Sequence, residues 1–354
     1  MKRRAGRLVG VLVFLPLVGA LTTCAIGMVS MPGQSFAGSA PALDEAGRAL
    51  RAQLTADIDH LAVTIGERNV RRQPQALATT ATYLEARLAD LGYVVEQQAY
   101  DASLYRAAEA DVLGPWSPPH RVMNLVAEKR GTTRPDEIVV VGAHYDSAEG
   151  TPGADDNATG VAAALAIAEA FVTHTPERTV RFVLFVNEEP PWFEGPHMGS
   201  EVYAQRCKDR REQIVAMIAL ETMGYFKDEP DTQQYPQPLA LAYPSTGNFI
   251  GFVGDTTAQP LVHDAIQAFR GAAQVGSQGA ALPATLPGVD WSDHGPFSRR
   301  GYRAFMVTDT APFRNPHYHE RGDVPAILDM QRLTRVVQGL IVVVDHVAAS
   351  TLRW

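Results

Sequence analysis

The sequence predicts a single α/β domain in which a central mixed, mostly parallel sheet lies between helices. Continuous apolar runs such as Ile138 to Val141 are typical of strands that are covered on both faces. These runs alternate with segments in which apolar residues recur every three or four positions, as they do in amphipathic helices. The alternation favours a layered helix–sheet–helix domain over residues 43–354.

The expected elements follow one another along this domain. Helices are expected over 43–65, 75–91, 160–173, 201–209, 259–269 and 329–351. Strands are expected over 93–98, 122–128, 137–143, 179–186, 214–220, 238–242 and 303–307. We expect irregular structure over 101–120, and a long loop beside the functional site over 271–289.

The composition excludes some classes of function. The chain has 354 residues, a net charge of -8 and two cysteines. No cluster of basic residues stands out, which argues against nucleic acid as a partner. Cys24 lies in the N-terminal apolar run, so the body of the chain has Cys207 alone and forms no internal disulfide. A chain of this length can bury a sufficient core without one.

The N-terminus has the sequence features of an export signal. Four basic residues within the first seven precede an uncharged apolar run from residue 8 to about 29. Residues 1–30 are therefore expected to be one apolar helix, either a signal peptide or a membrane anchor, followed by a linker over 31–42. Three outcomes stay open: an uncleaved anchor, cleavage near the small residues 37–40, or lipid attachment at Cys24. Each places the body outside the cytoplasm, on the periplasmic or extracellular face.

Residues of metal-binding type follow several of the apolar strands. Because sites in open α/β sheets form at the carboxyl ends of the strands, these side chains are expected to converge. They are His144, Asp146, Glu188, Glu189, Glu221 and His319.

Each of these motifs also has a simpler interpretation. His144 could be a surface histidine near an acid, or a ligand whose second nitrogen is held by Asp146. Asp156 and Asn157 could cap the helix that follows, or Asp156 could bridge two cations. A strand-terminal Glu221 could be merely structural.

Glu188 and Glu189 would ordinarily belong to a solvated surface. Here an apolar strand precedes them and two prolines follow, so they lie in a fixed loop. One of the two can bind a metal while the other handles protons. Two histidines and three carboxylates together suit zinc, although manganese or cobalt could occupy such a site.

The chain resembles the di-zinc aminopeptidases of the bacterial leucyl aminopeptidase type, to which glutamate carboxypeptidases and glutaminyl cyclases are related. The resemblance covers about residues 121–323 and rests on six motifs in the order of the family. They are His144-x-Asp146-Ser147, Asp155-Asp156-Asn157-x-x-Gly160, Asn187-Glu188-Glu189, Leu220-Glu221-x-x-Gly224-Tyr225, Ser292-Asp293-His294 and His319-x-x-x-Asp323.

The resemblance implies a zinc-dependent aminopeptidase that holds two Zn²⁺ ions. It implies that Asp156 bridges both ions. His144 and Glu221 would complete the ligands of the first ion, and Glu189 and His319 those of the second.

The resemblance also implies the catalytic groups. Glu188 would be the general base, and Asp146 would orient His144. Many members have Asp where this chain has Glu221, and some have a tyrosine before Ser-Asp-His that is missing here. The oxyanion and substrate contacts are therefore left to four candidates: Tyr225, Asp293, His294 and Tyr318.

Three other functions stay open on the same fold. They are cyclisation of N-terminal glutamine, carboxypeptidase cleavage, and binding without catalysis. Side-chain preference is not visible in the sequence, although Trp192, Phe193, Trp291 and Phe297 could line an apolar pocket.

Overall fold

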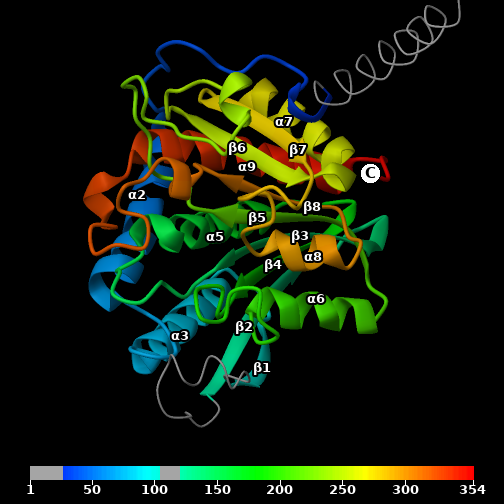
Figure 1. Ribbon diagram of the computed structural model, residues 1–354. Coiled ribbons are helices and arrows are strands. Elements are labelled where there is room, and N and C mark those ends of the chain that lie inside the picture. Colours follow the sequence, from blue (N-terminus) through cyan, green and yellow to red (C-terminus); the bar gives the residue numbers. More distant parts are fainter. Residues whose placement is uncertain (1–26, 104–119) are drawn as a thin grey trace, which may run out of the picture.

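The computed structural model describes residues 27–103 and 120–354, and Figure 1 shows a single sheet with helices packed on both of its faces. The strands are β1 (Glu96–Ala102), β2 (His120–Lys129), β3 (Arg134–His144), β4 (Arg178–Phe185), β5 (Gln213–Glu221), β6 (Phe249–Asp255), β7 (Gly276–Leu282) and β8 (Ala304–Thr308). Their order in the sheet is β1-β2-β4-β3-β5-β8-β6-β7. Among these, β3 is parallel to β4 and β5, β5 to β8, and β6 to β7. The expected mixed, mostly parallel sheet is confirmed.

The helices divide between the two faces of the sheet. One face carries α2 (Glu45–Asp59), α3 (Pro74–Asp90), α5 (Gly160–Phe171), α7 (Gln259–Ala272) and α9 (Met330–Ala349). The other carries α6 (Gly199–Asp209) and α8 (His294–Arg299). Alternate residues of β3 enter the two cores: Val139 and Val141 face the first set of helices, and Ile138 and Val140 face the second. This explains why the strand is apolar throughout.

The first helix leads toward the functional site. Asp44 caps α2 by accepting the backbone N–H of Gly47 at 2.8 Å. The helix continues into a wider turn, His60–Ile65, which ends at Gly66 with a φ of 79°. This left-handed residue turns the chain inward, so that Arg68 is fully buried.

Two sequence predictions about the later strands are wrong. The expected strand over 238–242 is a short 3₁₀ helix, Leu239–Leu241, in which Leu241 is 90% exposed. The expected loop over 271–289 contains β7, and β6 was not predicted at all. Both missed strands contain glycines, and β7 has the sequence GSQGAAL, which lacks the β-branched and aromatic residues by which strands are recognised.

The N-terminal segment (residues 27–41) lies against α7 and β7. Arg270 of α7 donates to the carbonyls of Met31, Pro32 and Gly33 at 2.9–3.2 Å. The backbone N–H of Ser277, on the edge strand β7, donates to the hydroxyl of Ser35 at 2.8 Å. The residues predicted as a linker are thus packed on the domain.

The predicted apolar helix lies almost entirely outside the described residues, as does most of the irregular segment 101–120. Within 27–103 and 120–354, none of the helices has both the length and the apolar character that a membrane crossing requires.

Candidate metal centre

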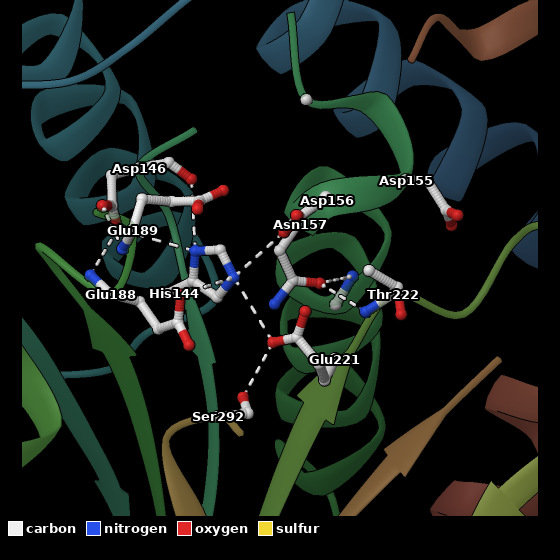
Figure 2. Close-up of polar contacts among 12 residues, drawn as sticks. His144, Asp146, Asp155, Asp156, Asn157, Glu188, Glu189, Glu221, Thr222 and Ser292 are labelled. Atoms are coloured by element: carbon white, nitrogen blue, oxygen red, sulfur yellow. Dashed lines mark hydrogen bonds and ion pairs between the residues drawn. The ribbon is translucent and has the colours of Figure 1, made fainter. Parts of the chain in front are cut away.

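Four parallel strands bring the predicted ligands to one edge of the sheet. His144 is the last residue of β3 and Glu221 the last of β5, while Glu188 and Glu189 follow the end of β4. His319 lies in the loop after β8. Figure 2 shows the side chains of His144, Asp156, Glu188, Glu189 and Glu221 pointing toward a common space.

Asp156 lies between the two histidines. Its Oδ1 is 3.2 Å from Nε2 of His144, and its Oδ2 is 3.2 Å from Nε2 of His319. On the first side, Glu221 Oε2 lies 3.3 Å from His144 Nε2. On the second, Glu189 Oε2 lies 3.0 Å from His319 Nε2. One carboxylate thus separates two small clusters of ligand atoms.

The ligand atoms are buried without hydrogen-bond partners. His144 Nε2, Asp156 Oδ1, Glu189 Oε1 and His319 Nε2 all lack one. Buried polar atoms are rarely left unpaired unless something else satisfies them. Two groups of three, His144–Glu188–Glu221 and Asp156–Glu189–His319, each bring their ligand atoms within 4.8 Å of one another. Imidazole and carboxylate groups so arranged fit zinc.

Asp146 holds two of these segments together. Its Oδ1 and Oδ2 accept the backbone N–H groups of Glu188 and Glu189, both at 3.1 Å. Its Oδ1 is also 3.5 Å from Nδ1 of His144, which lies 3.2 Å from the Asp146 carbonyl oxygen. One side chain therefore fixes both the imidazole and the glutamate loop.

The turn that carries Asp156 is anchored on both sides. Asp323 accepts the backbone N–H groups of Asp155 and Asp156 at 2.7 and 3.1 Å. Asn157 accepts the N–H groups of Gly160 and Thr222, both at 3.1 Å. Asn157 therefore accepts the N–H of the first residue of α5, as a capping side chain does, while Asp156 lies beside His144 and His319.

Burial and the neighbouring charges shift the pKa values of the carboxyl groups in the site. Burial opposes ionisation of Asp156, but the attraction of the His144 and His319 imidazoles, each 3.2 Å away, outweighs it and holds the pKa of Asp156 below the usual range. Burial raises the pKa of Glu188 well above its usual range and that of Glu189 to about 7. Such crowding of carboxylates is characteristic of sites that bind cations or move protons.

An apolar pocket opens beside the ligands. Glu221 and Tyr318 line it, and among the described residues of its lining Glu221 alone is charged. Its walls include Tyr243, Phe249, Val253, Leu282, Trp291 and Phe313. Trp291 was predicted to line such a pocket, whereas Phe297 lies fully buried in the core beside α6.

The four candidate oxyanion or substrate residues are placed differently. The Tyr318 ring stacks on His319 with centroids 3.9 Å apart and lines the apolar pocket. Asp293 is 1% exposed, and both of its carboxylate oxygens lack hydrogen-bond partners. His294 Nε2 lies 2.7 Å from the carbonyl oxygen of Val289, and Tyr225 is 5% exposed.

The supporting contacts of two further residues were not predicted from the sequence. Ser292 donates to Glu221 Oε2 at 2.8 Å, and Asp323 holds the Asp156 turn. Both appeared within motifs, but only the fold shows what they contact. Arg68, which lies outside every motif, is buried and donates to the carbonyls of Pro152 and Gly153, just before the same turn.

Comparisons with known proteins agree with this geometry. The model of "Peptidase family M28" matches residues 124–344. The chain is 37% identical over 227 residues to "Uncharacterized protein YfbL" of Escherichia coli (strain K12), covering 62% of this chain and 69% of that one. It is 27% identical over 252 residues to "Probable leucine aminopeptidase" of Arthroderma otae, covering 67% of this chain and 59% of the relative.

Two solved structures share the fold. A zinc aminopeptidase from Bacillus subtilis has a TM-score of 0.64 at 14% identity, covering 85% of this chain and 96% of that one. A glutaminyl cyclase from Bacteroides thetaiotaomicron has a TM-score of 0.61 at 17% identity, covering 86% and 98%. The resemblance drawn from the sequence is confirmed: the chain belongs to peptidase family M28 and is a metal-dependent peptidase.

Proposed function

We propose that this peptidase is a zinc aminopeptidase that binds two Zn²⁺ ions and removes single residues from the N-termini of peptides. The observation that carries the proposal is the position of Asp156, whose two oxygens each face a different histidine at 3.2 Å. A carboxylate shared in this way suits a pair of metal ions. The name of the Arthroderma otae relative and the Bacillus subtilis structure support the same choice.

His144, Asp156 and Glu221 would hold the first ion, and Asp156 would share the second with Glu189 and His319. Bound zinc would supply Lewis acidity that polarises the scissile carbonyl and makes water more acidic.

Glu188 is the proposed general base. Its Oε2 is 3.9 Å from His144 Nε2, and Asp146 fixes its backbone. The carboxylate takes a proton from the attacking water and gives it to the leaving amine. A raised pKa favours this exchange because the group can hold the proton between the two steps.

The apolar pocket would receive the side chain of the residue that is removed. It adjoins Glu221 and Tyr318, so a side chain seated there leaves its own carbonyl near the ligands. Its aromatic and aliphatic walls favour leucine, methionine or aromatic residues over charged ones. Tyr318, which lines the pocket and stacks on His319, would donate to the oxyanion.

We also propose that the enzyme works outside the cytoplasm, attached to the membrane through residues 1–30. The basic start and the apolar run that follows support this location. Fractionation of cells that produce the full chain, followed by detection in membrane and soluble fractions, tests it.

A mixed peptide library tests the activity. The full-length protein, purified in detergent, would be incubated with free and N-acetylated peptides, with and without a chelator, and the products read by mass spectrometry. Stepwise loss from free N-termini, abolished by the chelator and restored by zinc, is the expected result.

The other outcomes separate the alternatives. Loss from C-termini would show a carboxypeptidase, and loss of ammonia from N-terminal glutamine would show a cyclase. Intact peptides with zinc bound to the protein would favour a binding module.

A further inference from the structure

We propose that Arg68 is a positioning residue of the metal centre, because its guanidinium group ties together the two ends of the loop that separates His144 from Asp156. The inference rests on the metal centre proposed above. It concerns a residue outside all six motifs, 76 positions before the first proposed ligand in the numbering of the chain.

The guanidinium contacts both ends of this loop. Its Nε donates to the carbonyl of Tyr145 at 2.8 Å, one residue after His144. Its Nη1 donates to the carbonyl of Pro152 at 2.6 Å, and its Nη2 to that of Gly153 at 2.9 Å. The donors of a guanidinium are held in one rigid plane. The distance between the two ends of the loop is therefore set by a group that does not flex.

The backbone of Arg68 fixes the middle of the same loop. Its N–H donates to the hydroxyl of Ser147 at 3.1 Å, and its carbonyl accepts the N–H of Ser147 at 3.0 Å. Gly153 has a φ of 62°, and a Cβ there would meet the carbonyl oxygen of Asp156 at 2.4 Å and Arg68 Nη2 at 3.2 Å. A side chain at Gly153 would therefore clash with the Asp156 carbonyl oxygen and press on the Arg68 guanidinium.

The charge of Arg68 also acts on the site. The side chain is 0% exposed, and within the described part of the chain it forms no ion pair, since its donors go to carbonyl groups. The positive charge is therefore not cancelled locally and attracts Asp323, Asp146, Asp156 and Glu189. Burial lowers the pKa of Arg68 and the four carboxylates raise it; the balance is a pKa of about 10, so Arg68 remains a cation at neutral pH.

A second buried arginine supplies a matched control. Arg178 is also 0% exposed and donates to Glu137 at 2.7 Å and to the carbonyls of Val347 and Leu352 at 2.9 and 2.8 Å. It is the first residue of β4, at the opposite end of that strand from the proposed ligands. Loss of either arginine removes a buried guanidinium, but only one of the two touches the ligand loop.

The test compares zinc binding by full-length Arg68→Lys, Arg68→Met, Arg178→Lys and Arg178→Met. Affinity and stoichiometry would be measured by competition with a chromophoric chelator, and folding by circular dichroism. Both Arg68 variants are expected to bind zinc about 10–100-fold more weakly, as supporting groups of metal ligands do. Both Arg178 variants are expected to keep the affinity of the unmodified protein, even where their melting temperature falls.

Arg68→Lys keeps the charge but cannot reach both ends of the loop, so it tests the geometry if Arg68→Met does not fold. Unchanged zinc affinity in Arg68→Lys would overturn the proposal, and so would an equal loss in the Arg178 variants. If the unmodified protein bound no zinc, the proposed metal centre itself would fail. If instead the unmodified protein and the Arg68 variants bound zinc equally well, the metal centre would stand and only the role of Arg68 would fail.

Discussion

Asp323 accepts the backbone N–H of Asp156 at 3.1 Å across 167 residues of sequence. Its other oxygen accepts the N–H of Asp155 at 2.7 Å, so one carboxylate clamps two consecutive peptide groups. The proposed bridging ligand is therefore held by the loop that also carries His319. These hydrogen bonds connect the turn that carries Asp156 to the loop that carries His319.

Asp323→Asn should weaken zinc binding about 10-fold or more, because an amide has one acceptor oxygen for two buried N–H donors. Calorimetric titration with zinc measures the change. Asp255→Asn is the control for the same substitution away from the site, since Asp255 accepts the backbone N–H groups of Thr257 and Ala258 with a single oxygen, Oδ1, which an amide retains. Equal effects of the two substitutions would show that the clamp has no special role.

Glu188→Gln should reduce kcat by about 10²–10⁴-fold while zinc content and melting temperature stay near those of the unmodified protein, because an amide cannot accept the proton of water. The measurement is peptide hydrolysis together with metal analysis of the same sample. Glu194→Gln, an exposed glutamate in the same loop region, should keep full activity. High activity in Glu188→Gln would remove Glu188 from the role of base.

Zinc affinity should rise between about pH 6 and about pH 8, because zinc binds the deprotonated forms of its ligands. Burial opposes protonation of His319, but the carboxylates of Asp156 and Glu189, 3.2 and 3.0 Å from its Nε2, raise its pKa to about 11. The pKa of Glu189 is about 7. Below these pKa values protons therefore compete with zinc for the ligand atoms. For each proton that zinc displaces, the zinc affinity rises about tenfold per pH unit. Titrations in buffers of different ionisation enthalpy count these protons, and a pH-independent affinity would contradict the prediction.

Val253→Phe should narrow the apolar pocket and change substrate preference. Val253 lies on β6 among the residues that line it. We expect kcat/KM for N-terminal phenylalanine to fall about tenfold or more, while that for N-terminal alanine changes little, because only the larger side chain needs the lost space. Rates on a series of aminoacyl nitroanilides give the comparison. A parallel loss for all of them would indicate damage to the centre instead of a smaller pocket.

The order of apolar strands along the chain was sufficient to predict the fold class and the convergence of His144, Glu189 and Glu221. This worked because parallel strands end at a common edge, which makes strand-terminal residues neighbours whatever the loops do. The roles assigned to them remain predictions. β7 was missed because its glycines and alanines give no recognisable pattern of side chains, whereas β6 has the strand-forming residues Phe249, Ile250, Phe252 and Val253, interrupted by two glycines.

Arg68 and Asp323 could not have been given their contacts from the sequence. Each side chain forms hydrogen bonds with backbone groups. Because backbone groups are chemically the same at every position, the sequence does not reveal which of them will be bound. Which carbonyls surround a guanidinium, or which N–H groups meet a carboxylate, depends on how distant loops fold together.

The N-terminal segment has a consequence for maturation. Met28 and Val29 pack against Ala280, Leu282 and Val289, which also line the apolar pocket. A signal peptidase that cut within residues 37–40 would release this cover, leaving the edge of β7 and the back of a hydrophobic wall open to solvent. Exposed edges of this kind recruit strands from other molecules. Such a cut would therefore favour self-association, whereas an intact segment would keep this edge covered.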